Sequence, residues 1–258
     1  EYQNNTTLGN ARAGISGIGN YYGYFTTSFS ITYGRISNCD ITVSNESLVF
    51  DGTEKKPAVT VTCNGNTLTQ GQDYTLYYHA NTNAGSATVT ITGKGRFSGS
   101  VEKAFQIQPA DLSRSSVDLS ADSFTYDGTE KKPSVTVKTG NRQLTANSDY
   151  TVSFVNNTNA GSATVTVTGK GNYSGSVTKN FTISAASLEK AELALSASSF
   201  TYDGTEKKPD VTVTVNKKQL KKGTDYTVSY DNNTNIGTAS VTITGKGNYS
   251  GTVTKSFQ

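Results

Sequence analysis

The string Asp-Gly-Thr-Glu-Lys-Lys-Pro occurs three times in the chain, beginning at Asp51, Asp127 and Asp203. Both intervals are 76 residues long, with no insertion or deletion, so the chain contains a 76-residue repeat. A period of this length favours small domains in tandem, because solenoid repeats usually span about 20–50 residues. The repeat therefore restricts the fold to a row of similar modules.

This frame divides the 258 residues into four parts. We expect a half-repeat at 1–34, repeat 1 at 35–110, repeat 2 at 111–186 and repeat 3 at 187–258. The half-repeat matches the C-terminal half of a unit, since Tyr21 aligns with Tyr249 and Phe29 with Phe257. Tyr21 and Phe29 are therefore expected in a core. The frame leaves open whether residues 1–34 pair with the strands that follow them.

Apolar and polar residues alternate within each repeat, which predicts strands buried on one face. Ala163, Val165 and Val167 alternate with threonines, and Asp-Gly, Asn-rich and Gly-Lys-Gly turns separate the runs. About seven short strands per unit are typical of an all-β sandwich. No segment has a helical period, so the predicted fold class is all-β, with almost no helix.

Composition and charge exclude several classes of protein. Hydrophobic residues make up 33% of the chain, and no apolar run is long enough for a membrane span. The net charge of +3 comes from lysines spread near turns, so we expect no nucleic-acid partner. The sequence starts at Glu1 without Met or a signal peptide, which we interpret as processing or a fragment.

Four segments of repeat 3 form a recognisable frame: Tyr-Asp-Gly at 202–204, Asp-Tyr-Thr-Val-Ser-Tyr at 225–230, Asn-Asn-Thr-Asn at 232–235 and Val-Thr-Ile-Thr-Gly-Lys-Gly-Asn-Tyr-Ser-Gly at 241–251. This frame resembles bacterial immunoglobulin-like (Ig-like) repeats, most closely the MBG, or YGX-type, repeats of large surface proteins of gut Firmicutes. The resemblance implies tandem Ig-like β-sandwiches in an extracellular protein of the bacterial cell surface or cell wall. Such modules act as stalks, spacers or adhesive units, and the family brings no catalytic residues.

The residues offer little for catalysis or metal binding. The single histidine, His79, aligns with Val155 and Asp231, and no nucleophile elbow or zinc spacing accompanies it. The Asn-rich turn at 231–235 has too few carboxylates for calcium. We therefore expect no enzyme activity, no metal and no cofactor. The Glu-Lys-Lys-Pro segments are interpreted as solvated strand edges that discourage aggregation.

The two cysteines belong to the same repeat. Cys39 aligns with Ser115 and Ala191, and Cys63 aligns with Thr139 and Val215. Both positions lie in inward-facing sets, so a disulfide between the first and second strands and a pair of buried thiols are both compatible with the sequence.

Aromatic additions to the repeat are concentrated toward the N-terminus. Tyr22 and Tyr24 stand where other copies have Ser or Thr, and repeat 1 adds Tyr77 beside His79, Arg96 and Phe97. Exposed Tyr and Arg side chains are favoured in recognition. These six residues are the candidate ligand-binding site.

The sequence thus predicts a monomeric, non-catalytic stalk or spacer that presents or separates other modules. The alternative is an adhesin that binds a host protein or glycan through these aromatic residues.

Overall fold

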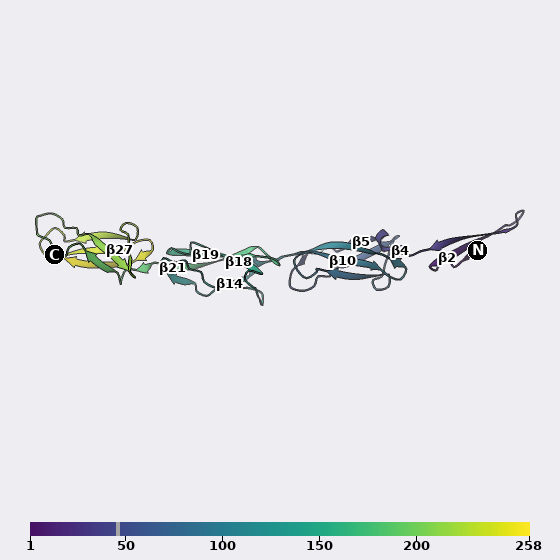
Figure 1. Ribbon diagram of the computed structural model, residues 1–258, viewed down its shortest axis with the longest axis horizontal. Coiled ribbons are helices and arrows are strands. Elements are labelled where there is room, and N and C mark those ends of the chain that lie inside the picture. Colours follow the sequence, from purple (N-terminus) through teal and green to yellow (C-terminus); the bar gives the residue numbers. More distant parts are fainter. Residues whose placement is uncertain (45–46) are drawn as a thin grey trace. The chain divides into compact units, whose positions relative to one another are not determined.

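A computed structural model describes residues 1–44 and 47–258, and it confirms the all-β prediction (Figure 1). The helical segments among the described residues are two single 3-10 turns, η1 (Ile36–Asn38) and η2 (Leu112–Arg114). In the described part of the chain, no helix has the length and apolarity needed to cross a membrane. The chain divides into two compact units, Glu1–Ala110 and Asp111–Gln258.

Repeat 2 consists of two sheets that face each other across an apolar core. The first sheet has the order β14 (Ser116–Leu119), β16 (Val135–Thr139), β17 (Arg142–Gln143). The second has the order β15 (Ser123–Thr125), β21 (Ser176–Ser184), β19 (Gly161–Gly169), β18 (Tyr150–Val155). All neighbours are antiparallel except β15 and β21, which are parallel. Two short strands, β13 (Ala110–Asp111) and β20 (Tyr173–Ser174), complete the strands of this region.

The alternating pattern of the sequence determines which side chains enter this core. Ala163, Val165 and Val167 on β19 are fully buried, as their spacing predicts, while Thr164 and Thr166 between them are only half-buried. Val137 on the opposite sheet is also fully buried. The period of two therefore sets the register, because a slip by one residue would bring threonines inward.

Repeat 3 has the same two-sheet pattern, and β27 lies among its strands in green and yellow (Figure 1). Its sheets are β23 (Glu192–Leu195), β24 (Val211–Val215), β25 (Lys218–Gln219), and β26 (Tyr226–Asp231), β27 (Ala239–Gly245), β29 (Thr252–Phe257). In the described part of repeat 3 no strand corresponds to β15, but the amide of Phe200 donates a hydrogen bond to the carbonyl of Gln258 at 2.6 Å. A short parallel pair, β22 (Ala186–Ser187) and β28 (Tyr249–Ser250), closes the end of the repeat.

Repeat 1 follows the same plan. Its sheets are β5 (Asp40–Val43), β7 (Val59–Cys63), β8 (Asn66–Thr67), and β6 (Leu48–Val49), β12 (Ser100–Gln108), β10 (Gly85–Gly93), β9 (Tyr74–His79). Its closing pair is β4 (Gly34–Arg35) with β11 (Phe97–Ser98). Gly34, which the sequence frame assigns to the half-repeat, therefore pairs with a strand of repeat 1.

The half-repeat forms one three-stranded antiparallel sheet of β1 (Tyr2–Gln3), β2 (Gly9–Ser16) and β3 (Tyr24–Ile31). Within the described residues, these strands pair only with each other. The prediction that Tyr21 and Phe29 lie in a core is wrong for this chain, since both side chains are exposed. Their counterparts Tyr249 and Phe257 are buried against a second sheet, and no second sheet faces the half-repeat among the described residues.

Candidate functional site

The outward face of the second sheet of repeat 1 presents Tyr77 and His79. Both lie on β9, with Tyr77 opposite Thr90 and His79 opposite Thr88 on β10. The Tyr77 side chain is 68% exposed, and His79 is also exposed. The face is therefore an open strip of hydroxyl, phenol and imidazole groups.

Arg96 and Phe97 lie at the end of the repeat 1 sandwich, in the turn after β10 and at the start of β11. With Asn64, Leu68 and Asp73 among its neighbours, this turn lines a pocket of about 460 Å³. The Phe97 ring is half-buried against Gly34, where an added Cβ would lie 3.0 Å from the Phe97 Cδ1 atom. Arg96 and Phe97 thus form an end surface, whereas Tyr77 and His79 belong to the outward sheet face.

Tyr22 and Tyr24 belong to the half-repeat. Tyr22 is fully exposed between β2 and β3, and Tyr24 begins β3 opposite Ser16. The Tyr24 hydroxyl covers Gly14, where any side chain would collide with it. The other copies have Thr at the Gly14 position, so the absence of a side chain there accommodates the added ring.

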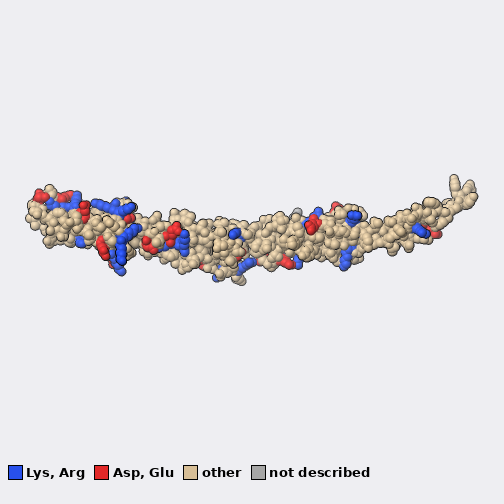
Figure 2. Space-filling view, viewed as in Figure 1, with Lys and Arg blue, Asp and Glu red and all other residues tan. Residues whose placement is uncertain are grey.

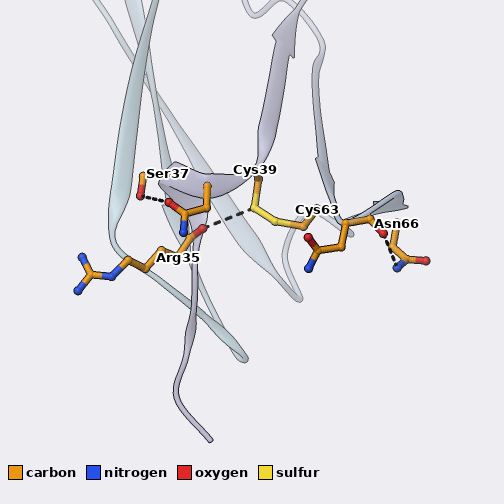
Figure 3. Close-up of a disulfide and its surroundings, with 7 residues drawn as sticks. Arg35, Ser37, Cys39, Cys63 and Asn66 are labelled. Carbon is orange, nitrogen blue, oxygen red and sulfur yellow. Dashed lines mark hydrogen bonds between the residues drawn. A yellow bond between two sulfur atoms is a disulfide. The ribbon is translucent and has the colours of Figure 1, made fainter.

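The structure joins Cys39 and Cys63 in a disulfide with a Cα–Cα distance of 4.6 Å (Figure 3). Cys39 follows η1, and its sulfur lies 3.7 Å from the carbonyl oxygen of Arg35, while Cys63 ends β7. Of the two interpretations that the sequence leaves open, the structure therefore contains the disulfide.

The same position is filled differently in the other repeats. In repeat 2, the hydroxyls of Ser115 and Thr139 form a hydrogen bond of 2.7 Å. In repeat 3, Val215 belongs to the buried apolar cluster and the partly buried Ala191 packs against this cluster. The fold thus accepts a covalent bond, a hydrogen bond or an apolar contact at one geometric position.

The Asp-Gly-Thr-Glu-Lys-Lys-Pro segment is held by a local network in each repeat. In repeat 2, the Asp127 carboxylate accepts hydrogen bonds from the Thr129 amide and hydroxyl and pairs with Lys131 at 2.5 Å. The Asn157 side-chain amide donates to the Lys131 carbonyl at 3.0 Å. The prediction that these segments are solvated is therefore wrong for their first lysine. The side chain of Lys131 is only 11% exposed, and those of Lys55 and Lys207 are 13% and 20% exposed. Lys132 remains exposed.

These contacts lower the pKa of the aspartate. Hydrogen bonds from the Lys131 and Thr129 side chains, and then from the Thr129 amide, hold the pKa of Asp127 well below its usual range. Asp51 and Asp203 are affected in the same way in their own repeats. The Asp-Gly-Thr-Glu-Lys-Lys-Pro segment is thus a turn held by its own side chains. Figure 2 shows positive and negative side chains next to one another on the surface viewed.

The junction of repeats 2 and 3 contains contact residues that the sequence analysis did not single out. The side chain of Asn248 accepts a hydrogen bond from the Ala160 amide at 2.7 Å and donates one to the Asn159 side chain at 3.1 Å. The rings of Tyr126 and Tyr249 meet edge to face at 5.6 Å. Asn248 and Tyr249 come from the Gly-Lys-Gly-Asn-Tyr segment. The repeated sequence predicted that this segment is a turn, but it did not show that the turn contacts repeat 2.

Lys218 adds a third contact to this junction. Its ammonium group lies 5.6 Å from the centre of the Tyr126 ring, within the range of a cation–π interaction. Tyr126 is thereby held between the ring of Tyr249 and the charge of Lys218.

One comparison with known proteins, the match to a family model, agrees with this architecture over one repeat. Among solved structures, the chain is similar to a "Protocadherin gammaB7 EC3-6 cis-dimer structure" at 10% identity and a TM-score of 0.22, over 96% of this chain and 83% of that chain. A search of curated proteins found no match. Residues 125–185, from the end of β15 to just beyond β21, match the family model of the bacterial Ig-like domain (group 3). Repeats 1 and 3 have the same pattern of two sheets, so the chain is a tandem array of Ig-like sandwiches preceded by a single sheet.

Proposed function

We propose that the chain is a non-catalytic, extracellular spacer of a bacterial surface protein, in which Ig-like repeats hold other modules apart. The match to bacterial Ig-like domains supports the class of protein. The Cys39–Cys63 disulfide supports an oxidising location outside the cell. The observation that carries the proposal is the junction of repeats 2 and 3.

A spacer must resist bending between its domains. A single residue, Ala185, separates the last strand of repeat 2 from the first strand of repeat 3, so little flexible linker is present. The Ala186 amide donates to the Asn248 carbonyl at 2.9 Å, and the Asn248 side chain contacts the turn of repeat 2. The short connection and the side-chain contacts together restrict the angle between the two repeats.

Pulsed electron–electron double resonance measures this restriction directly. Spin labels are placed at the exposed positions Thr151→Cys in repeat 2 and Thr227→Cys in repeat 3 of the full chain. The two native cysteines are bonded to each other and do not take up the label. We expect a narrow distribution of distances between the labels.

The Asn248→Ala variant should broaden this distribution, because it removes two hydrogen bonds worth about 0.5–1.5 kcal/mol each. Asn180→Ala is the matched control, since Asn180 is an exposed asparagine that contacts Thr164 within repeat 2. A distribution that is already broad in the unmodified chain would contradict the spacer function.

A second function, adhesion to a host glycan or protein, is favoured by one observation. Tyr77 is 68% exposed on an outward sheet face, where Ser153 and Ser229 occupy the same position in the other repeats. Aromatic faces of this kind provide rigid contact area with a polar group at the edge. Glycan arrays with the unmodified chain and the Tyr77→Ser variant test this function, and equal binding by both proteins would rule out Tyr77 as the contact.

A further inference from the structure

The half-repeat sheet exposes one apolar face. This face, here called the bare face, includes Tyr2, Ala13, Ile15, Phe25 and Phe29. Ala11, which lies opposite Phe29 on the same face, is already buried. Ile15 is 62% exposed and Phe29 is 40% exposed. Their counterparts in repeat 3, Ile243 and Phe257, are 0% and 3% exposed.

Repeat 3 shows what covers the same face in a complete unit. Val213, Val215 and Leu220, from the first sheet and the turn after it, belong to one buried cluster with Ile243 and Phe257. The covering residues therefore come from the first half of the repeat, which precedes β26 in sequence.

The edge of the half-repeat sheet is also incomplete. In repeat 3, β26 spans six residues and pairs with β27 from Asp231 opposite Ser240 to Tyr226 opposite Gly245. Its counterpart β1 has two residues, and Tyr2 lies opposite Ala13 in the same register as Tyr230 opposite Val241. Beyond the hydrogen bonds between Glu1 and Gly14, the edge of β2 has no strand beside it in the described residues. An incoming strand in line with β1 would extend this pairing.

The pocket at the end of repeat 1 is an independent second feature. It is lined by Asn64, Asn66, Leu68, Arg96 and Phe97. These residues align with Asn216, Lys218, Leu220, Asn248 and Tyr249 of repeat 3. There, the same end surface contacts the ring of Tyr126, which comes from the Tyr-Asp-Gly of the first half of repeat 2. Arg96 offers a guanidinium group in the pocket, where repeat 3 uses Lys218 as the cation.

We propose that the bare face and the repeat 1 pocket form one binding surface for the first half of an Ig-like repeat, a segment equivalent to residues 187–228. Its sheet covers Ile15 and Phe29, and the tyrosine of its Tyr-Asp-Gly enters the pocket beside Phe97 and Arg96. The last strand of the segment lies in line with β1 and continues its antiparallel pairing with β2. The proposed ligand of the bare face is thus a polypeptide that forms a sheet like that of β23 to β25. Binding such a segment is a function beyond that of a spacer.

The test joins a second copy of residues 187–228 directly to Glu1 of the full chain. Hydrogen–deuterium exchange is then followed in β2 and β3, with β27 of repeat 3 in the same molecule as the reference. We expect exchange in β2 and β3 to slow by at least about tenfold, toward the rate of β27, since cooperative burial protects amides. Binding of the dye anilinonaphthalene sulfonate to the bare face should be lost.

Two control proteins separate the parts of this proposal. A copy of residues 187–228 with shuffled sequence should leave exchange in β2 and β3 unchanged. A copy carrying Tyr202→Ser should still protect β2 and β3 but should fail to protect residues 64–68 and 96–97 around the pocket.

Two results would overturn the proposal. One is unchanged exchange in β2 and β3 when the native copy is present. The other is a dimer of the 258-residue chain that protects Ile15 and Phe29 and persists when the copy is added, because the occupant of the bare face would then be a second copy of this chain.

Discussion

Replacing the disulfide of repeat 1 with the pair that repeat 2 uses naturally tests how the bond stabilises the fold. The double variant Cys39→Ser, Cys63→Thr reproduces Ser115 and Thr139, whose hydroxyls are 2.7 Å apart. Because the fold already holds that pair at the same position, the substitution should cause no steric conflict. The difference in stability then reports the loss of the covalent bond.

The expected magnitude follows from the length of the closed loop. The cysteines are separated by 24 residues, and the chain-entropy model gives about 3.5 kcal/mol for a loop of this size. The new hydrogen bond returns about 1 kcal/mol. We therefore expect repeat 1 to lose about 2.5 kcal/mol, which corresponds to a fall of about 10–20 °C in the melting temperature of a domain this small.

Differential scanning calorimetry of the full chain measures this effect, with exchange in β5 and β7 identifying the transition of repeat 1. The matched control is Ser115→Ala, Thr139→Val, which gives repeat 2 the Ala191–Val215 pair of repeat 3. Replacing both partners of a hydrogen bond by apolar groups is nearly neutral, so repeat 2 should shift little. A loss of less than about 1 kcal/mol in repeat 1 would refute the assumption that the bond acts by restricting the unfolded chain.

Three further predictions concern the core and the Asp-Gly-Thr-Glu-Lys network. Ile243→Ala should destabilise repeat 3 by about 2–5 kcal/mol in urea titrations, whereas Ile15→Ala at the equivalent exposed position should cost far less. Asn157→Ala should cost repeat 2 about 1–3 kcal/mol, because the Lys131 carbonyl loses its buried donor, and equal unfolding midpoints would contradict this. The pKa of Asp127 is lowered in the folded state, so its contribution is present above the unfolded pKa of about 3.9 and is lost as the pH falls further. The urea midpoint of repeat 2 should therefore decline below that pH, and Asp127→Asn should reduce the decline.

The fold was predictable because its two governing patterns can be read along the sequence without knowledge of tertiary contacts. The alternation of Val165, Thr166 and Val167 identifies a strand and its buried face within a few residues. The 76-residue spacing identifies the units without any knowledge of contacts. The Asp-Gly turns likewise act over short distances.

The candidate site was only partly predictable, because contacts between distant residues decide exposure. Phe97 was grouped with Tyr77 as a ligand-binding residue, but its ring packs on Gly34 at the end of the sandwich. The side chain of Lys131 was expected in solvent, but it pairs with the Asp127 carboxylate, and the Lys131 carbonyl accepts a hydrogen bond from the Asn157 side chain. In both cases the sequence gives the type of residue, but it does not show which other residues contact that side chain in the folded domain.

The sequence by itself determined the strands, the repeat and the alignment of Phe29 with a core position, since these depend on the order of residues along one strand. Only the tertiary structure decided that Phe29 is exposed, that Cys39 and Cys63 are bonded, and that Asn248 reaches across to repeat 2. The physical reason is that burial and pairing depend on a second sheet or a second repeat. The alternation along a strand predicts which face of the sheet is apolar. Whether that face is buried depends on a second sheet formed by residues far away in the chain.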